Sequence, residues 1–125
     1  MDSCQRRGII TKSREETKKD IVRIVPSSLL IVSFFTHVSQ LFIYGHTPPT
    51  IIVAAFGVMY FVISAFMIMG YGYSALAASV VPAIGASLGV YRFLTIIPNP
   101  FSIFNVALDA IIVPISIILV WRWLR

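Results

Sequence analysis

The sequence predicts an all-α membrane protein, a four-transmembrane-helix antiparallel bundle with short loops. Hydrophobic residues make up 58% of the chain, and the mean hydropathy of +0.88 is far above that of an ordinary soluble domain. Residues 26–121 carry only two formal charges, Arg92 and Asp109. This region divides into four apolar segments, each near the ~20 residues that cross a bilayer core. A transmembrane β-barrel would instead show shorter segments of alternating polarity.

Residues 1–25 form a basic tail that precedes the transmembrane domain, residues 26–125. Residues 1–12 are expected to be flexible. Ser13 and Glu16 have the spacing of a capping box, which predicts a short juxtamembrane helix over about 13–24. A disordered basic tail is the alternative, because short isolated helices are marginal in water. The basic residues lie where anionic lipid headgroups are contacted, so we expect lipid rather than nucleic acid to be their partner.

Turn residues separate the four apolar segments. The first segment, 26–44, ends before Gly45 and the Pro48-Pro49 pair, which cannot continue a helix. The second, 50–69, ends at a Gly-Tyr-Gly-Tyr turn, and the third, 74–96, ends at Pro98-Asn99-Pro100. The fourth, 102–121, closes on an aromatic and basic anchor, residues 121–125.

The distribution of Lys and Arg predicts the orientation. Seven basic residues precede the first segment, two follow the fourth, and the three loops contain none. An even number of spans places both termini on one side, and the positive-inside rule makes that side cytoplasmic. Nucleic-acid binding is not expected, because the basic tail lacks the interleaved aromatic residues of single-strand binders.

Each segment carries a stripe of polar or small residues at helical spacing. Such stripes should face the bundle interior or a partner, because polar groups avoid lipid tails. The members at corresponding depths form a predicted intramembrane polar cluster of His37, Gln40, Arg92, Asn105 and Asp109. The third segment also carries Ala78, Gly85 and Gly89, a small-residue face suited to close helix packing. We expect this face to pack inside the same bundle, with a partner helix as the alternative.

Arg92 and Asp109 lie on adjacent antiparallel segments, each roughly 8–10 Å below the outer end. A direct ion pair between them is the expected arrangement, because mutual pairing is how buried charges are usually tolerated in membranes. The functional alternative is a proton or ion site that includes His37. No metal or cofactor is expected, because one intramembrane histidine cannot ligate a haem alone and the only cysteine is Cys4 in the tail.

Two functions follow from these features. The first is a small non-enzymatic subunit that scaffolds or stabilises a larger membrane complex, bound to other membrane subunits or to itself. The alternative is a small oligomeric transporter or channel with His37, Arg92 and Asp109 as its polar site. In layout the chain resembles the small multidrug resistance transporters. Those carry an essential glutamate in the first span, where this chain has His37 and no carboxylate. An enzyme is not expected, because no catalytic constellation is present.

Overall fold

The computed structural model describes residues 3–96 and 98–125, and describes no side chains for residues 12–20. Its helices are α1 (Ser3–Tyr44), α2 (Pro48–Ile68), α3 (Gly72–Thr95) and α4 (Pro100–Leu124), with no strand in the described ranges. Each helix contains a stretch of 21 to 25 residues that is long and apolar enough to cross a membrane. The predicted four-helix membrane bundle is therefore confirmed, and the chain is a multi-pass integral membrane protein.

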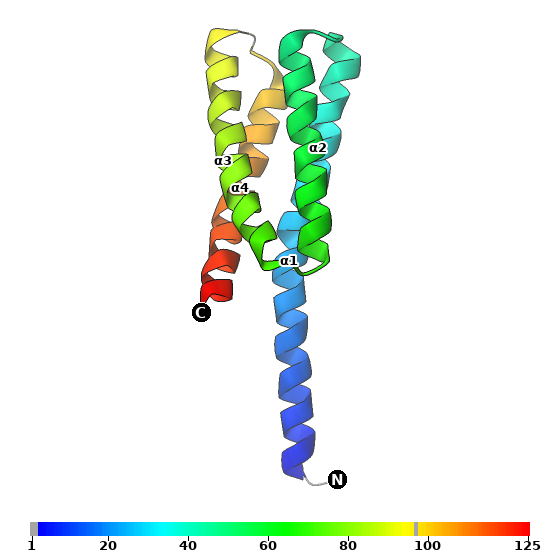
Figure 1. The fold of residues 1–125 in the computed structure, drawn as a ribbon, viewed down its shortest axis with the longest axis vertical. Coiled ribbons are helices and arrows are strands. Elements are labelled where there is room, and N and C mark those ends of the chain that lie inside the picture. Colours follow the sequence, from blue (N-terminus) through cyan, green and yellow to red (C-terminus); the bar gives the residue numbers. More distant parts are fainter. Residues whose placement is uncertain (1–2, 97) are drawn as a thin grey trace.

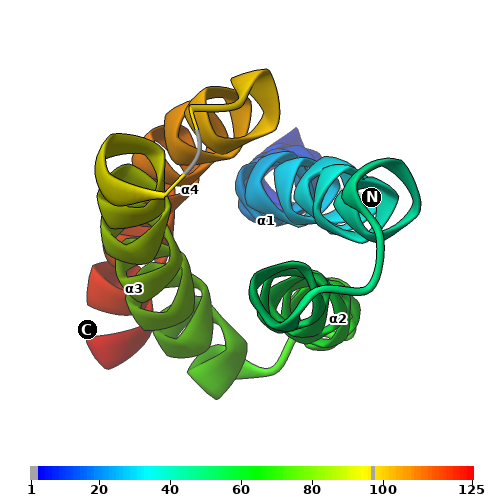
Figure 2. The ribbon, with the colours of Figure 1, turned by 90° about the horizontal axis from the view of Figure 1, so that it is seen from above.

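The bundle consists of two tight hairpins. Helix α1 packs chiefly against α2, and α3 against α4, whereas α1 meets α4 less extensively and α2 meets α3 least among these four neighbouring pairs. Seen from above, the helices follow the order α1, α2, α3, α4 around a ring (Figure 2). The α1–α2 and α3–α4 connections lie at one end, which we call the two-loop end, and the α2–α3 connection lies at the other (Figure 1).

Two of the helices, α2 and α4, begin at a proline. Helix α2 starts at Pro48 and α4 at Pro100, two residues earlier than the sequence predicted in each case. A first-turn proline costs no helical hydrogen bond, because the first N–H groups have no partner inside the helix. The side chain of Asn99 caps α4 by accepting a 2.7 Å hydrogen bond from the Ser102 backbone N–H.

The first helix differs most from expectation. It begins at Ser3 and continues without a break through Pro26, so the prediction of a flexible segment over 1–12 and a helix start at 13 was wrong. Pro26 has no N–H to donate to the Val22 carbonyl. In the adjacent turn, Ser27 Oγ donates a 2.7 Å hydrogen bond to the Arg23 carbonyl. The predicted Ser13–Glu16 capping box falls outside the described side chains. The N-terminal part of α1 projects beyond the other three helices (Figure 1).

The buried core is small and mixed in polarity. Leu30, Tyr60, Ala78 and Ile112 are fully buried apolar or aromatic residues from the four helices. Ser64 Oγ joins α2 to α1 by donating 2.9 Å to the Ser27 carbonyl. Large Ile, Leu, Val and Phe side chains cover the outer faces of all four helices. This arrangement is inverted relative to a soluble protein and suits lipid contact.

Candidate functional site

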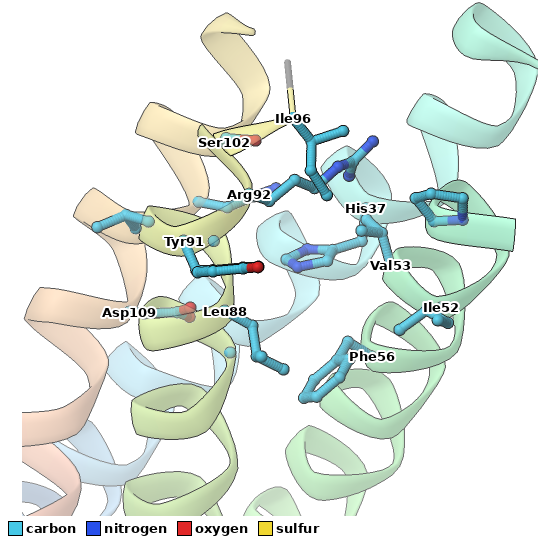
Figure 3. A pocket seen from close by; sticks show the side chains of 15 residues that line it. His37, Ile52, Val53, Phe56, Leu88, Tyr91, Arg92, Ile96, Ser102 and Asp109 are labelled. Atoms are coloured by element: carbon cyan, nitrogen blue, oxygen red, sulfur yellow. The ribbon is translucent and has the colours of Figure 1, made fainter. Parts of the chain in front are cut away.

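A cavity of about 190 Å³ opens where α2 and α3 diverge, toward the two-loop end. All four helices contribute to its wall (Figure 3). The residues with polar groups on the wall are His37, Tyr91, Arg92, Ser102, Asn105 and Asp109. The rest of the wall is mainly apolar and includes Val53, Phe56, Leu88 and Val106.

Asp109 lines the deep end of the cavity, and its hydrogen-bond partner Tyr60 lies outside the cavity wall. Tyr60 is completely buried and donates a 3.1 Å hydrogen bond from its hydroxyl to Asp109 Oδ2. The other carboxyl oxygen, Oδ1, has no hydrogen-bond partner among the described residues, and Asp109 is only 2% exposed. Gly85 lies against this pair, so closely that a Cβ added there would collide with the Tyr60 hydroxyl. An incompletely paired carboxyl group in a membrane interior marks a candidate binding position.

Arg92 lies nearer the two-loop end. Its guanidinium Nη1 donates a long, 3.4 Å hydrogen bond to Gln40 Oε1 on α1. Its Nε–H finds no acceptor among the described residues, although the side chain is only 9% exposed. The cavity therefore holds two buried groups of opposite charge, and each retains an unused hydrogen-bonding atom.

The predicted ion pair between Arg92 and Asp109 is not formed: among the described residues, Arg92 bonds to Gln40 and Asp109 to Tyr60. The helix boundaries explain the difference. Arg92 lies three residues before the end of α3, whereas Asp109 lies nine residues after the start of α4. Six residues of difference at 1.5 Å each put the Asp109 backbone about 9 Å deeper than that of Arg92. Figure 3 shows the two side chains at these different levels.

His37 contributes from α1. Its Nδ1 lies 2.7 Å from the Ser33 carbonyl oxygen, which can only accept, so this contact requires the proton on Nδ1. The ring meets the Tyr60 ring edge-on at 5.1 Å between centroids. The backbone contact and the aromatic contact together fix the ring orientation, and His37 lines the cavity.

Asn105 links the cavity wall to α1, because Thr36 Oγ1 donates a hydrogen bond to Asn105 Oδ1. Four of the five residues of the predicted polar cluster line the cavity, and Gln40 lies behind Arg92 as its hydrogen-bond partner. The helical spacing of the sequence places Tyr60 on the polar stripe of the second span, but the predicted cluster did not include it. Thr36 was not singled out.

The small residues of α3 pack within this chain. Ala78 is completely buried. A Cβ added at Gly89 would lie 3.0 Å from Val106 Cγ2 on α4, and Gly85 faces Tyr60 on α2. Gly57 plays the same role between α2 and α1, where an added Cβ would lie 2.8 Å from the His37 Cβ. These glycines set the spacing of the helices around the cavity.

The donor set does not suit a metal ion. Within the described part of the chain, no group of three or more His, Cys, Asp or Glu residues is close enough to hold one. Comparison with known protein families, curated proteins and solved structures finds no match to this chain. The cavity wall carries one carboxyl group, one guanidinium group and one imidazole in a largely apolar enclosure.

Proposed function

We propose that this protein is a small membrane transporter whose binding site is the cavity between α2 and α3. The carrying observation is the free Oδ1 atom of Asp109, buried at the deep end of a cavity with other polar groups on its wall. Buried ionisable groups of this kind mark substrate and ion pathways in membrane proteins. Transporter sites likewise lie within the membrane at helix interfaces.

A direct pair between Arg92 and Asp109 would favour a structural role, because each charge would then neutralise the other. Their hydrogen bonds instead go to Gln40 and Tyr60. A scaffold has no need for a cavity between weakly packed helices or for a buried carboxyl oxygen without a partner. A transporter needs both, because substrate must enter the bundle and find an unsatisfied group there.

Uptake into proteoliposomes tests this function. The purified chain is reconstituted, and uptake of three radiolabelled probes is measured: 6-aminohexanoate, hexyltrimethylammonium and hexanesulfonate. These represent a zwitterion, a permanent cation and a permanent anion of similar size. We expect saturable uptake of at least one probe above protein-free liposomes, with loss of uptake in Asp109→Asn.

Ser116→Ala is the matched control, because Ser116 is also buried on α4, also lacks a described partner, and lies outside the cavity wall. Its uptake should equal that of the wild type. Absence of uptake for all three probes, or equal uptake in Asp109→Asn, contradicts the proposal.

A second candidate, a non-enzymatic subunit of a larger membrane complex, is favoured by the projecting part of α1. Ile9 and Ile10 on that segment are 52% and 65% exposed, and the other three helices end before reaching it (Figure 1). A partner protein on that side would cover these side chains. Purification in mild detergent, with and without deletion of residues 3–11, tests this role. A defined partner that co-purifies with the full chain and is lost on deletion supports it, whereas an unaccompanied full chain contradicts it.

We further propose that both termini face the cytoplasm. The positive-inside rule supports this orientation, because Arg23 lies at one end of the first span and Arg122 and Arg125 at the same end of the fourth. The projecting basic part of α1 would then lie beside the anionic lipids of the inner leaflet.

A further inference from the structure

We propose that the cavity binds a small extended zwitterion, with its ammonium group at Asp109 and its anionic group at Arg92. This inference rests on the transport function proposed above and names the class of substrate. It is carried by two residues on the wall of one cavity, each with a buried side-chain atom that has no described partner. Asp109 Oδ1 can accept a hydrogen bond and Arg92 Nε can donate one, and neither has a described partner.

A ligand with a single charge satisfies only half of this site. A cation at Asp109 would leave the Arg92 Nε–H without an acceptor, and an anion at Arg92 would leave Asp109 Oδ1 without a donor. Each unsatisfied buried polar group costs the complex free energy, because its interactions with water are lost without replacement. A zwitterion satisfies both groups and adds no net charge to the membrane interior.

The spacing of the two groups favours an extended ligand over an α-amino acid. The Asp109 backbone lies about 9 Å deeper than that of Arg92, and the two side chains bond to different helices. Figure 3 shows the rings of His37 and Tyr91 between these levels, and Phe56 and Leu88 at or below the level of Asp109. A methylene chain between the charged ends would pass against the two rings.

The size of the cavity sets the size of the ligand. A volume of about 190 Å³ exceeds the roughly 150 Å³ of a cavity that holds benzene. By the same ratio the cavity has room for about eight non-hydrogen atoms. 6-Aminohexanoate, with nine, is close to this size and has an extended chain and opposite charges at its two ends.

Two sources offer this chemistry: a free ω-amino acid, or the headgroup of a zwitterionic phospholipid that enters where α2 and α3 diverge. Saturable binding of radiolabelled 6-aminohexanoate to the purified chain is measured in phosphatidylglycerol nanodiscs, with and without phosphatidylethanolamine. Binding that persists unchanged with phosphatidylethanolamine identifies a free zwitterion. Binding in phosphatidylglycerol that phosphatidylethanolamine abolishes identifies the lipid headgroup. Both results require the site to bind a zwitterion.

Competitors with one charge test the pairing. Hexylamine and hexanoate should displace 6-aminohexanoate at least tenfold less well than unlabelled 6-aminohexanoate does, because each lacks one charge-assisted hydrogen bond. Leucine, whose charges are adjacent, should also compete at least tenfold less well. The proposal is overturned if any of these three compounds displaces radiolabelled 6-aminohexanoate as effectively as unlabelled 6-aminohexanoate does at the same concentration. It is also overturned if 6-aminohexanoate shows no saturable binding.

Two isosteric variants assign the two ends. Asp109→Asn should weaken 6-aminohexanoate binding at least tenfold, and hexanoate should then compete about as well as the zwitterion. Arg92→Gln should also weaken binding at least tenfold, and hexylamine should then compete about as well. Ser116→Ala should bind 6-aminohexanoate as the wild type does. If Asp109→Asn or Arg92→Gln binds no 6-aminohexanoate but keeps the wild-type thermal unfolding and elution volume, the result still supports a zwitterion site. Unchanged 6-aminohexanoate binding in either variant overturns the assignment.

The outcomes separate this inference from the transport function. Selective binding of 6-aminohexanoate without uptake of any of the three probes into proteoliposomes retains the zwitterion site and refutes transport. Uptake of hexyltrimethylammonium or hexanesulfonate without 6-aminohexanoate binding retains transport and refutes the zwitterion site.

Discussion

The contact between Gly85 and Tyr60 can be tested directly by adding one methyl group. In Gly85→Ala the new Cβ would collide with the Tyr60 hydroxyl, which is held in place by its 3.1 Å hydrogen bond to Asp109. The next nearest atoms, Asp109 Oδ2 at 3.4 Å and Tyr60 Cζ at 3.5 Å, would be at ordinary contact distances. The hydroxyl is therefore the main obstacle, and removing it should remove most of the penalty.

The expected energies follow from this geometry. Overpacking of a well-packed interior costs about 1–3 kcal/mol, and replacing a helical glycine by alanine recovers up to about 1 kcal/mol. Gly85→Ala should therefore lower the free energy of unfolding by up to about 2 kcal/mol. Tyr60→Phe should lower it by about 0.6 to 1.7 kcal/mol through the lost hydrogen bond to Asp109. In the Tyr60→Phe background, Gly85→Ala should be neutral or stabilising by up to about 1 kcal/mol.

Equilibrium unfolding in mixed SDS and dodecylmaltoside micelles measures all four members of this double-mutant cycle. The coupling energy between the two positions should be about 1–3 kcal/mol. If Gly85→Ala costs the same with and without the tyrosine hydroxyl, with a coupling energy below about 0.5 kcal/mol, the proposed collision is wrong. The deep end of the cavity would then be built differently.

Three further predictions concern other parts of the bundle. Gly57→Ala should lower the free energy of unfolding by up to about 2 kcal/mol, because its Cβ would meet the fixed Cβ and backbone of α1. Gly8→Ala, with open space around it, should be neutral or stabilising in the same SDS titration. Thr36→Val should cost about 0.6 to 1.7 kcal/mol by removing the hydrogen bond to Asn105, and this cost should vanish in the Asn105→Ala background of a double-mutant cycle. Cys4, the only cysteine, should react with a membrane-impermeant maleimide in inverted but not in right-side-out vesicles; labelling in right-side-out vesicles would reverse the proposed orientation.

The sequence predicted the architecture because each span is independently recognisable. Hydrophobic length and turn residues identify the four helices without any tertiary contact, since the bilayer imposes the same length on each. It did not predict the long first helix. A capping pattern at Ser13 resembles a helix start, but the backbone continues as a helix from Ser3. Local capping signals do not decide whether a preceding segment is also helical.

Helical periodicity in the sequence by itself determined that residues such as His37, Asn105 and Asp109 would face inward, because polar side chains in a membrane turn away from lipid. Only the tertiary structure decided their partners. The axial offset between Arg92 and Asp109 depends on where α3 ends and where α4 begins. Helix α4 begins at Pro100, earlier than the sequence predicted. Tyr60 reaches Asp109 from α2 because Gly85 leaves space for its hydroxyl. Such contacts between helices distant in sequence leave no periodic signal along the chain.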